Sequence, residues 1–224
     1  MSRCMALILT IASTISICAA QNEVKYADEQ EMPASLVEDS YAIFQMVLPS
    51  NAIEWSDVKR TQWLLSDTTT AVPLKADCNG EGAMDIRRSV TPPDSRQSEW
   101  NEVLSDFDVR CHERYKLDGS RFHEAVPVHL LDDAAQKRYW SGVSGFKPPS
   151  NNIMQAPPTP DDFKGAAGLH SFSGVYFNRA HTLAAVYFGM GCGSLCGNST
   201  WVVLEKQSDG TWQRLRWVHS MTFS

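Results

Sequence analysis

The chain is poor in concentrated positive charge. Its 20 Lys and Arg stand against 26 Asp and Glu, which gives a net charge of −6 and a pI near 5.5. Nucleic acids and anionic membrane surfaces bind proteins through a concentrated basic patch. The nearest clusters here are Arg87-Arg88 and Arg214 with Arg216, and both are small. The composition therefore argues against either partner.

A long apolar run is also missing. The run from Met5 to Ile17 has about 13 residues, whereas a membrane-spanning helix needs about 20. Arg3 precedes it, and Cys18-Ala19-Ala20 supplies the small residues that a signal peptidase reads. We expect a signal peptide over residues 1–20, cleavage after Ala20, and a secreted or periplasmic protein without a transmembrane segment. Lipidation of Cys18 is the alternative, but Ile17 stands where a small residue is wanted.

Recognisable catalytic motifs are absent from the sequence. A serine hydrolase usually places its nucleophile in G-x-S-x-G, but Ser194 has Cys192 and Cys196 at the glycine positions. Paired acids such as Asp132-Asp133 fall at helix ends or in loops, where solvated carboxylates are ordinary. The sequence favours a non-catalytic protein and indicates no cofactor and no metal.

The cysteine content points to disulfides. Removing the signal peptide leaves Cys78, Cys111, Cys192 and Cys196, an even number in an oxidising compartment. Of three possible pairings we favour Cys192 with Cys196 and Cys78 with Cys111, because the first two share one glycine-flanked turn. The alternative is a thiol-dependent redox or metal-binding protein that uses Cys192 and Cys196, although redox cysteines usually begin a helix.

The remaining chain suits one domain. Residues 21–32 are polar and acidic and predict a flexible N-terminal arm. Residues 33–224 are long enough to bury a single core, with a proline-rich surface loop at 143–168. We find no internal repeat.

The hydrophobic periodicity predicts an α+β fold with a mainly antiparallel sheet. Apolar residues recur at helical spacing over Ser35 to Leu48 and over Ser95 to Phe107, and we expect both helices on one face. A strand is expected near Gln62 to Thr69, and another, interrupted by Pro127, at an edge or bulge. The C-terminal region predicts a four-strand meander. Its expected segments are 172–177, 182–190, 201–206 and 211–219.

The tip and aromatic residues of this meander suggest a contact surface. The candidates are Ser194, Leu195, Tyr176, Trp201 and Trp212. Their partner would be an unknown protein or a small ligand in the cell envelope. The alternative is that the aromatic rings form a two-sided core. We interpret Asn198-Ser199-Thr200, which also fits a glycan acceptor, as a turn.

The C-terminal quarter resembles a group of uncharacterised exported bacterial proteins with the pattern SxVxFN...AxVYxxxxCGxLCG. The matching residues are Ser173, Val175, Phe177, Asn178, Ala184 or Ala185, Val186, Tyr187, Cys192-Gly193-Ser194-Leu195-Cys196-Gly197, Leu204-Glu205-Lys206 and Gly210-Thr211-Trp212. The resemblance implies export and a terminal sheet, but no activity. The chain departs from the pattern at Gly174 and Tyr176, where a basic residue and a glycine are expected.

Overall fold

The computed structural model describes residues 28–50, 59–70, 78, 84–143, 159–193 and 196–223. The helices are α1 (Ala34–Ser50), α2 (Ile86–Ser89), α3 (Gln97–Arg110) and α4 (Asp133–Val143). The strands are β1 (Glu29–Glu31), β2 (Trp63–Ser66), β3 (Arg114–Lys116), β4 (Val128–Leu131), β5 (Leu169–Phe172), β6 (Tyr176–Phe177), β7 (Leu183–Gly193), β8 (Cys196–Lys206), β9 (Trp212–Leu215) and β10 (Thr222–Phe223). The α+β class is confirmed. Among the described helices, none is both long and apolar enough to cross a membrane.

The main sheet has eight strands in the order β10-β8-β7-β5-β2-β4, with β6 also paired to β7 and β9 to β8. The C-terminal meander is confirmed, because β7, β8 and β9 pair as antiparallel neighbours. The sheet is mixed, since β2 runs parallel to both β4 and β5. The strand expected over Phe122 to Leu131 is shorter than predicted, since β4 begins after Pro127, and it lies at an edge as this proline indicated.

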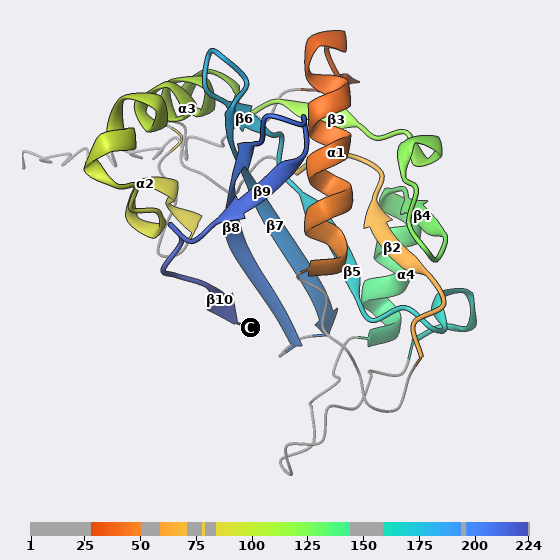
Figure 1. The fold of residues 1–224 in the computed structure, drawn as a ribbon. Coiled ribbons are helices and arrows are strands. Elements are labelled where there is room, and N and C mark those ends of the chain that lie inside the picture. The colour runs from red at the N-terminus through yellow and green to blue at the C-terminus, as the bar shows by residue number, and fades with distance from the viewer. Residues whose placement is uncertain are drawn as a thin grey trace, which may run out of the picture.

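Helices cover both faces of this sheet, whereas the sequence predicted both main helices on one face. Phe44 and Leu48 of α1 share a hydrophobic cluster with Val186 and Phe188 of β7. The alternate β7 residues instead join Trp100, Val103 and Phe107 of α3 in a second cluster: Leu183, Ala185 and Tyr187. Because side chains alternate along a strand, α1 and α3 lie on opposite faces. Figure 1 shows α1 in front of the sheet and α4 behind it.

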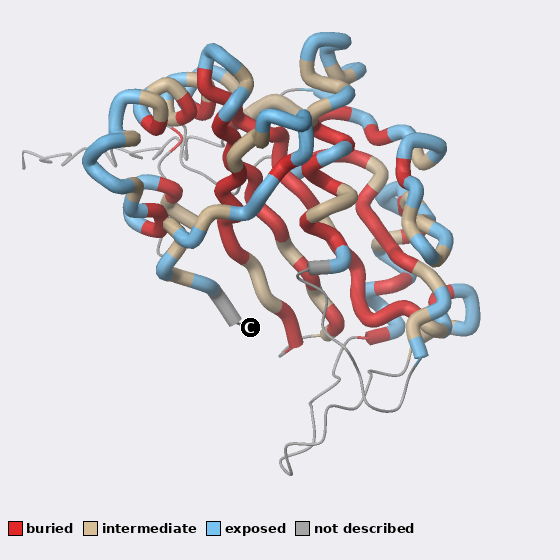
Figure 2. Tube along the Cα trace, viewed as in Figure 1, coloured by how far each residue is buried: buried red, intermediate tan, exposed pale blue. Residues whose placement is uncertain are grey.

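A third hydrophobic cluster joins α4 to its end of the sheet. Ala135, Tyr139 and Val143 of α4 pack against Leu64 of β2 and Leu169 of β5. Leu64 pairs with Leu169, which pairs in turn with Gly191, so this cluster lies on the α3 face of the sheet. The strands between the helix layers are the most buried part of the molecule (Figure 2).

The predicted N-terminal arm is ordered in part. Glu29–Glu31 forms β1, which pairs in parallel with β3, and the Arg114 guanidinium lies 2.9 Å from the Glu29 carboxylate. This strand consists of exposed polar residues and shows no alternation of apolar and polar side chains, so nothing in the sequence indicated a strand here. The predicted signal peptide and residues 21–27 lie outside the described residues.

The predicted surface loop at 143–168 is likewise packed at both ends. Val143 ends α4 in the core, and Phe163 and Ala166 are only 4 % and 2 % exposed. Residues 144–158, with four of the five loop prolines, lie outside the described residues. The description as a surface loop is therefore wrong for its C-terminal part, where Phe163 anchors a short 3-10 turn against Tyr139.

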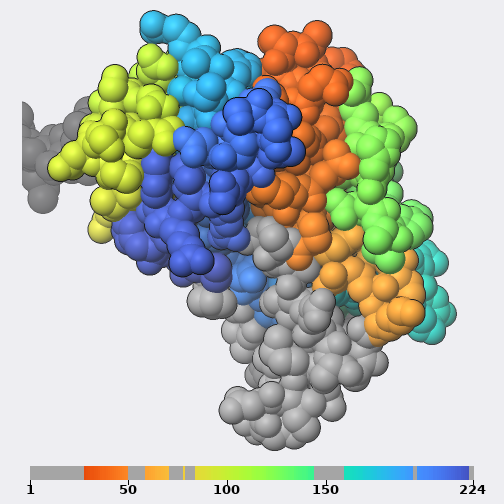
Figure 3. Space-filling model, in the orientation of Figure 1, coloured from red at the N-terminus to blue at the C-terminus, as the bar shows by residue number. Residues whose placement is uncertain are grey.

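The terminal hairpin extends further than predicted. Strands β7 and β8 pair from Leu183 with Glu205 to Gly193 with Cys196. Asn198 to Thr200 therefore lie inside β8 and do not form the turn that was expected. Long antiparallel pairing satisfies their backbone groups, and this stabilises a strand where the side chains alone favour a turn. At the surface, α1 lies between β9 and the segment near residue 120, as Figure 3 shows.

Candidate functional site

Four cysteines form two disulfides in the interior. Cys78 is bonded to Cys111 and Cys192 to Cys196, with Cα–Cα distances of 6.0 and 5.0 Å, which is the pairing that the sequence favoured. Cys192 is 0 % exposed and Cys196 is 8 % exposed. Both residues lie in strands, at the ends of β7 and β8 that face each other across the hairpin, whereas a reactive thiol is usually found at a helix N-terminus or beside a cation. This setting argues against the thiol-dependent alternative at this pair.

The aromatic contact surface suggested by the sequence is wrong, because its rings are core residues. Tyr176 and Trp201 are 1 % and 0 % exposed and meet the Phe107 ring edge-on, with centroids 4.9 and 5.7 Å apart. Trp212 is 8 % exposed and packs on the α1 side. These rings face the helices on both sides of the sheet. Ser194 and Leu195 lie outside the described residues.

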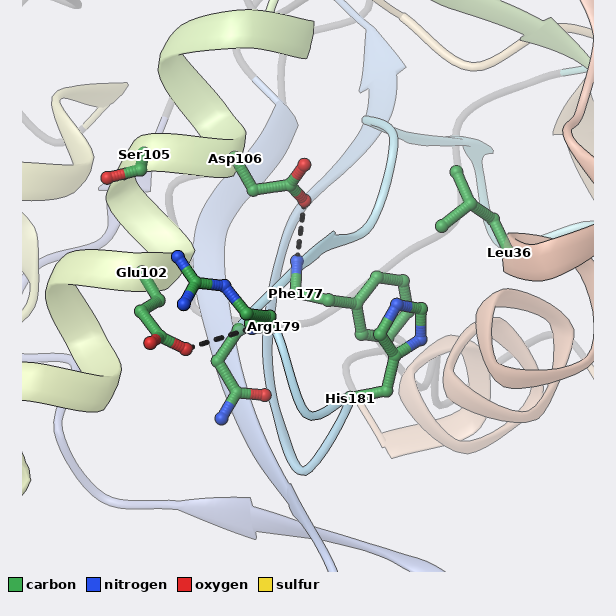
Figure 4. A pocket seen from close by; sticks show the side chains of 8 residues that line it. Leu36, Glu102, Ser105, Asp106, Phe177, Arg179 and His181 are labelled. Atoms are coloured by element: carbon green, nitrogen blue, oxygen red, sulfur yellow. Dashed lines mark hydrogen bonds between the residues drawn. The ribbon is translucent and has the colours of Figure 1, made fainter.

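One pocket, of about 320 Å³, lies where the turn between β6 and β7 meets α3 and α1. Figure 4 shows the His181 ring stacked on Phe177, with centroids 4.6 Å apart, and Glu102 and Asp106 reaching from α3. Ser105 points away from the His181 ring in this view and donates to the Asn101 carbonyl at 2.8 Å. Ser105 is therefore not placed as a nucleophile beside this histidine.

The polar groups of this pocket hold the turn together. The Asp106 carboxylate accepts from the backbone N–H of Phe177 at 2.8 Å, and Glu102 accepts from that of Arg179 at 3.0 Å. The Asn178 side-chain oxygen accepts from the N–H groups of Thr182 and Leu183 at 2.8 and 2.9 Å. Groups already committed to backbone partners have less capacity for a ligand. We assign these contacts a structural role.

A larger groove, of about 480 Å³, lies on the α3 face of the sheet, between the α3 cluster and the α4 cluster. We call it the serine groove and define it by residues from the sheet and from α4: Ser66, Gln136, Trp140, Ser171, Tyr187, Gly189, Gly191 and Ser199. Its volume falls within the roughly 300–1,000 Å³ of small-molecule sites.

The floor of the serine groove is a row of small residues across adjacent strands. Ser171 of β5 lies opposite Gly189 of β7, which lies opposite Ser199 of β8. Ser66 is two residues after Leu64 on β2 and therefore points to the same face. A Cβ atom on Gly189 would lie 3.0 Å from the Ser171 hydroxyl oxygen, so glycine keeps the middle of this row open.

The walls of the groove combine aromatic rings with amide and hydroxyl groups. Trp140 of α4 is 41 % exposed, and its indole lies over Gly191, where a Cβ atom would come within 2.4 Å of the ring. The Tyr187 hydroxyl donates to the Ser199 hydroxyl at 2.7 Å, and the Gln136 amide donates to the Ser66 hydroxyl at 3.0 Å. A serine hydroxyl that accepts one hydrogen bond can still donate its own O–H.

The groove is electrically neutral near pH 7. None of its described lining residues is Asp, Glu, Lys or Arg. Burial lowers the pKa of His170 to about 4, so this imidazole is uncharged, and its ring packs edge-on against Trp63 on the α1 side. Burial also raises the pKa of the Tyr187 hydroxyl, which stays protonated. Such a surface is suited to an uncharged, polar ligand.

Sequence reasoning missed this groove, although one signal was present. Gly189, Gly191 and Gly193 alternate in the sequence, and alternate residues share one face of a regular strand; Gly189 and Gly191 do so in β7, whereas a register shift precedes Gly193. Glycine at every second position marks a face where another group approaches the backbone closely. The serines come from separate strands, and the sequence does not show that these strands are neighbours. Comparison with known protein families, with curated proteins and with solved structures returns no match.

Proposed function

We propose that the protein is an exported, non-catalytic binding module, stabilised by two disulfides, whose ligand occupies the serine groove. The observation that carries this proposal is the open, uncharged groove with a hydroxyl floor and an exposed indole wall. The N-terminal pattern over residues 1–20 and the resemblance to exported bacterial proteins support export. The two disulfides are consistent with it, because such bonds persist in oxidising compartments.

The chemistry of the groove favours binding over catalysis. General acid–base catalysis works best with a group whose pKa lies near the operating pH. The titratable groups among its described lining residues are His170, whose pKa is lowered to about 4, and Tyr187, whose pKa is raised. Neither exchanges a proton readily at neutral pH.

The ligand class that fits is a neutral, hydroxyl-rich compound such as an oligosaccharide. Serine hydroxyls both donate and accept, as do sugar hydroxyls. Trp140 presents an aromatic face at the end of the row, and an apolar face of a sugar ring can lie against such a surface. A strongly charged ligand would lose its hydration without gaining an opposite charge among the described lining residues.

Direct titration tests the binding proposal. Neutral cellotriose, maltotriose and chitotriose are titrated into the folded protein, with calorimetry and tryptophan fluorescence as readouts, beside a neutral tripeptide. We expect one trisaccharide class to bind, and the S171A/S199A variant to weaken that binding about tenfold through loss of two hydrogen bonds. S105A, which removes an exposed hydroxyl on α3, is the matched control. Equal affinity in the double variant, or no saccharide binding at millimolar concentration, would overturn the proposal.

Export is tested independently of the ligand. Cell fractionation and N-terminal sequencing should find the protein outside the cytoplasm with Gln21 as its first residue. Thiol titration of the unfolded, unreduced chain should find no free sulfur among the four paired cysteines. A chain that keeps Met1 and carries free thiols would contradict export while leaving the saccharide result intact.

A further inference from the structure

A cluster with metal-ligand chemistry lies at the Cys78–Cys111 disulfide, and none of its residues lines the serine groove. Cys111 and His112 directly follow the end of α3, and Cys78 is held beside them by its bond to Cys111. The His112 Nε2 atom is 3.7 Å from the Cys78 Sγ atom. The ligand atoms of all three residues lie within 4.8 Å of one another. Among the described residues, these three are the one group of Cys, His, Asp or Glu side chains close enough together to hold a metal ion.

The spacing of these atoms fits a tetrahedral zinc ion once the disulfide is cut. Zn–S bonds of about 2.3 Å and Zn–N bonds of about 2.0 Å imply N···S separations of about 3.6 Å and S···S separations of about 3.8 Å. The imidazole therefore already stands at the required distance from Cys78. After reduction the two sulfur atoms, no longer bonded, move apart to ligand spacing, and the Cys111 sulfur, which lies within 4.8 Å of the imidazole ligand atom, takes up the same spacing from it.

Burial and charge favour a metal ion over free thiolates at this position. Cys78 and Cys111 are 5 % and 0 % exposed, and two isolated thiolates there would be strongly disfavoured by loss of hydration. Two thiolates and one Zn²⁺ are neutral together. The carbonyl groups at the C-terminal end of α3 carry partial negative charge, which favours a cation nearby. His112 is only partly buried, so solvent contacts the cluster at this residue.

We propose that reduction converts the Cys78–Cys111 disulfide into a zinc site with Cys78, Cys111 and His112 as protein ligands. A dithiol reductant supplies two electrons and two protons: the S–S bond breaks, two protein thiols form, and the dithiol closes to its own disulfide. Zn²⁺ then displaces the two thiol protons to solvent and binds the thiolates. A disulfide oxidant reverses the sequence and releases the ion. The oxidised and zinc-bound forms exclude one another, and neither depends on the serine groove.

Cobalt substitution tests this site in a C192S/C196S background, where the remaining cysteines among the described residues are Cys78 and Cys111. After reduction with dithiothreitol and anaerobic desalting, Co²⁺ alone is titrated and then displaced with Zn²⁺. We expect one ion per chain, a thiolate-to-cobalt charge-transfer band, and no binding to the oxidised protein. H112A should weaken Zn²⁺ binding at least about tenfold, because loss of even an outer-shell partner costs 10–100-fold. H123A, which removes an exposed histidine, should leave it unchanged.

Urea unfolding distinguishes Zn²⁺ binding by the folded, reduced protein from Zn²⁺ binding by a partly unfolded chain. Zn²⁺ should raise the urea midpoint of the reduced protein and leave that of the oxidised protein unchanged, because an ion that binds the folded state stabilises it. Equal binding by H112A and the parent would overturn the proposal. So would binding without a rise in the midpoint, or a thiolate–cobalt band that persists when Cys78 and Cys111 are replaced by serine.

Discussion

Asp106 and Arg110 form an ion pair within α3, and each also bonds to the backbone at or beside β6: Asp106 to Phe177 and Arg110 to Val175. The Arg110 Nε atom donates to the Asp106 carboxylate at 2.7 Å, a second guanidinium nitrogen makes a further contact with it, and the same nitrogen donates to the Val175 carbonyl at 2.7 Å. Burial lowers the pKa of Arg110, but its hydrogen bonds to Asp106 more than offset this and raise that pKa above its ordinary value. The guanidinium thus depends on Asp106 for its charge compensation.

Removal of Asp106 should destabilise the fold by a measurable amount. Breaking a fully buried pair costs about 3–5 kcal/mol. The Arg110 and Asp106 side chains are 12 % and 27 % exposed, so solvent screens part of this interaction and we expect about 2–4 kcal/mol for D106A. R110M removes the positive charge and keeps an unbranched apolar side chain at this position. In the D106A/R110M protein about half of the loss should be recovered, because the unpaired charge is gone while the Phe177 N–H and the Val175 carbonyl still lack these partners. The cycle through both single variants should give a coupling energy of about 2 kcal/mol.

Urea unfolding followed by tryptophan fluorescence measures this coupling. With a slope of about 2 kcal/mol per M, a loss of about 3 kcal/mol lowers the midpoint by about 1.5 M. The matched surface pair is Arg121 with Glu38, whose side chains are 43 % and 87 % exposed, and the cycle through E38A, R121M and E38A/R121M should give a coupling energy below about 1 kcal/mol. A coupling between Asp106 and Arg110 no larger than that of the surface pair would refute the reasoning from burial.

Three further predictions concern the core and its bonds. Burial places the pKa of His170 at about 4, below about 6.5 in the unfolded chain, so the stability that it contributes is present above pH 6.5 and is lost as the pH falls toward 4. In H170F the urea midpoint should fall less between pH 7.5 and pH 4.5 than it does in the parent protein. An unchanged fall would contradict the assignment of this pH dependence to His170. G191V should displace the Trp140 indole from its position over the strand, which should lower the free energy of unfolding by about 1–3 kcal/mol and shift the tryptophan emission maximum. An unchanged emission maximum would contradict the close approach of the indole to Gly191. Loop entropy assigns about 4 kcal/mol to the Cys78–Cys111 bond, with a separation of 33, and about 2 kcal/mol to Cys192–Cys196, with a separation of 4. C78A/C111A should therefore lower the melting temperature more than C192A/C196A, and the reverse order would show that the second bond does more than close a short loop.

The local elements could be predicted from the sequence because they rest on local patterns. The apolar spacing over Ser35 to Leu48 and over Ser95 to Phe107 corresponds to α1 and α3, and the expected turns at residues 178–181 and 207–210 separate the strands of the meander. Pro127 indicated an edge, and β4 lies there. Helical periodicity and turn residues report on their own neighbourhood in the chain.

The placement of the helices and the groove could not be predicted in the same way. Every β7 residue from Leu183 to Phe188 is buried, so the strand has no polar side to show which face each helix covers. The parallel pairing of β2 with β5 joins residues about a hundred positions apart. Ser66 and Ser171 become neighbours only through that pairing, and neither has a chemical signature of its own.

The hydrophobic clusters of α3 and α4 are separate, and the row of small polar residues crosses the same face of the sheet. Ser66 and Ser199 accept hydrogen bonds from Gln136 and Tyr187, so a hydroxyl at these two positions also supports the fold. If the row binds a ligand as proposed, exchange between serine and threonine there would change ligand preference while both apolar cores stay the same.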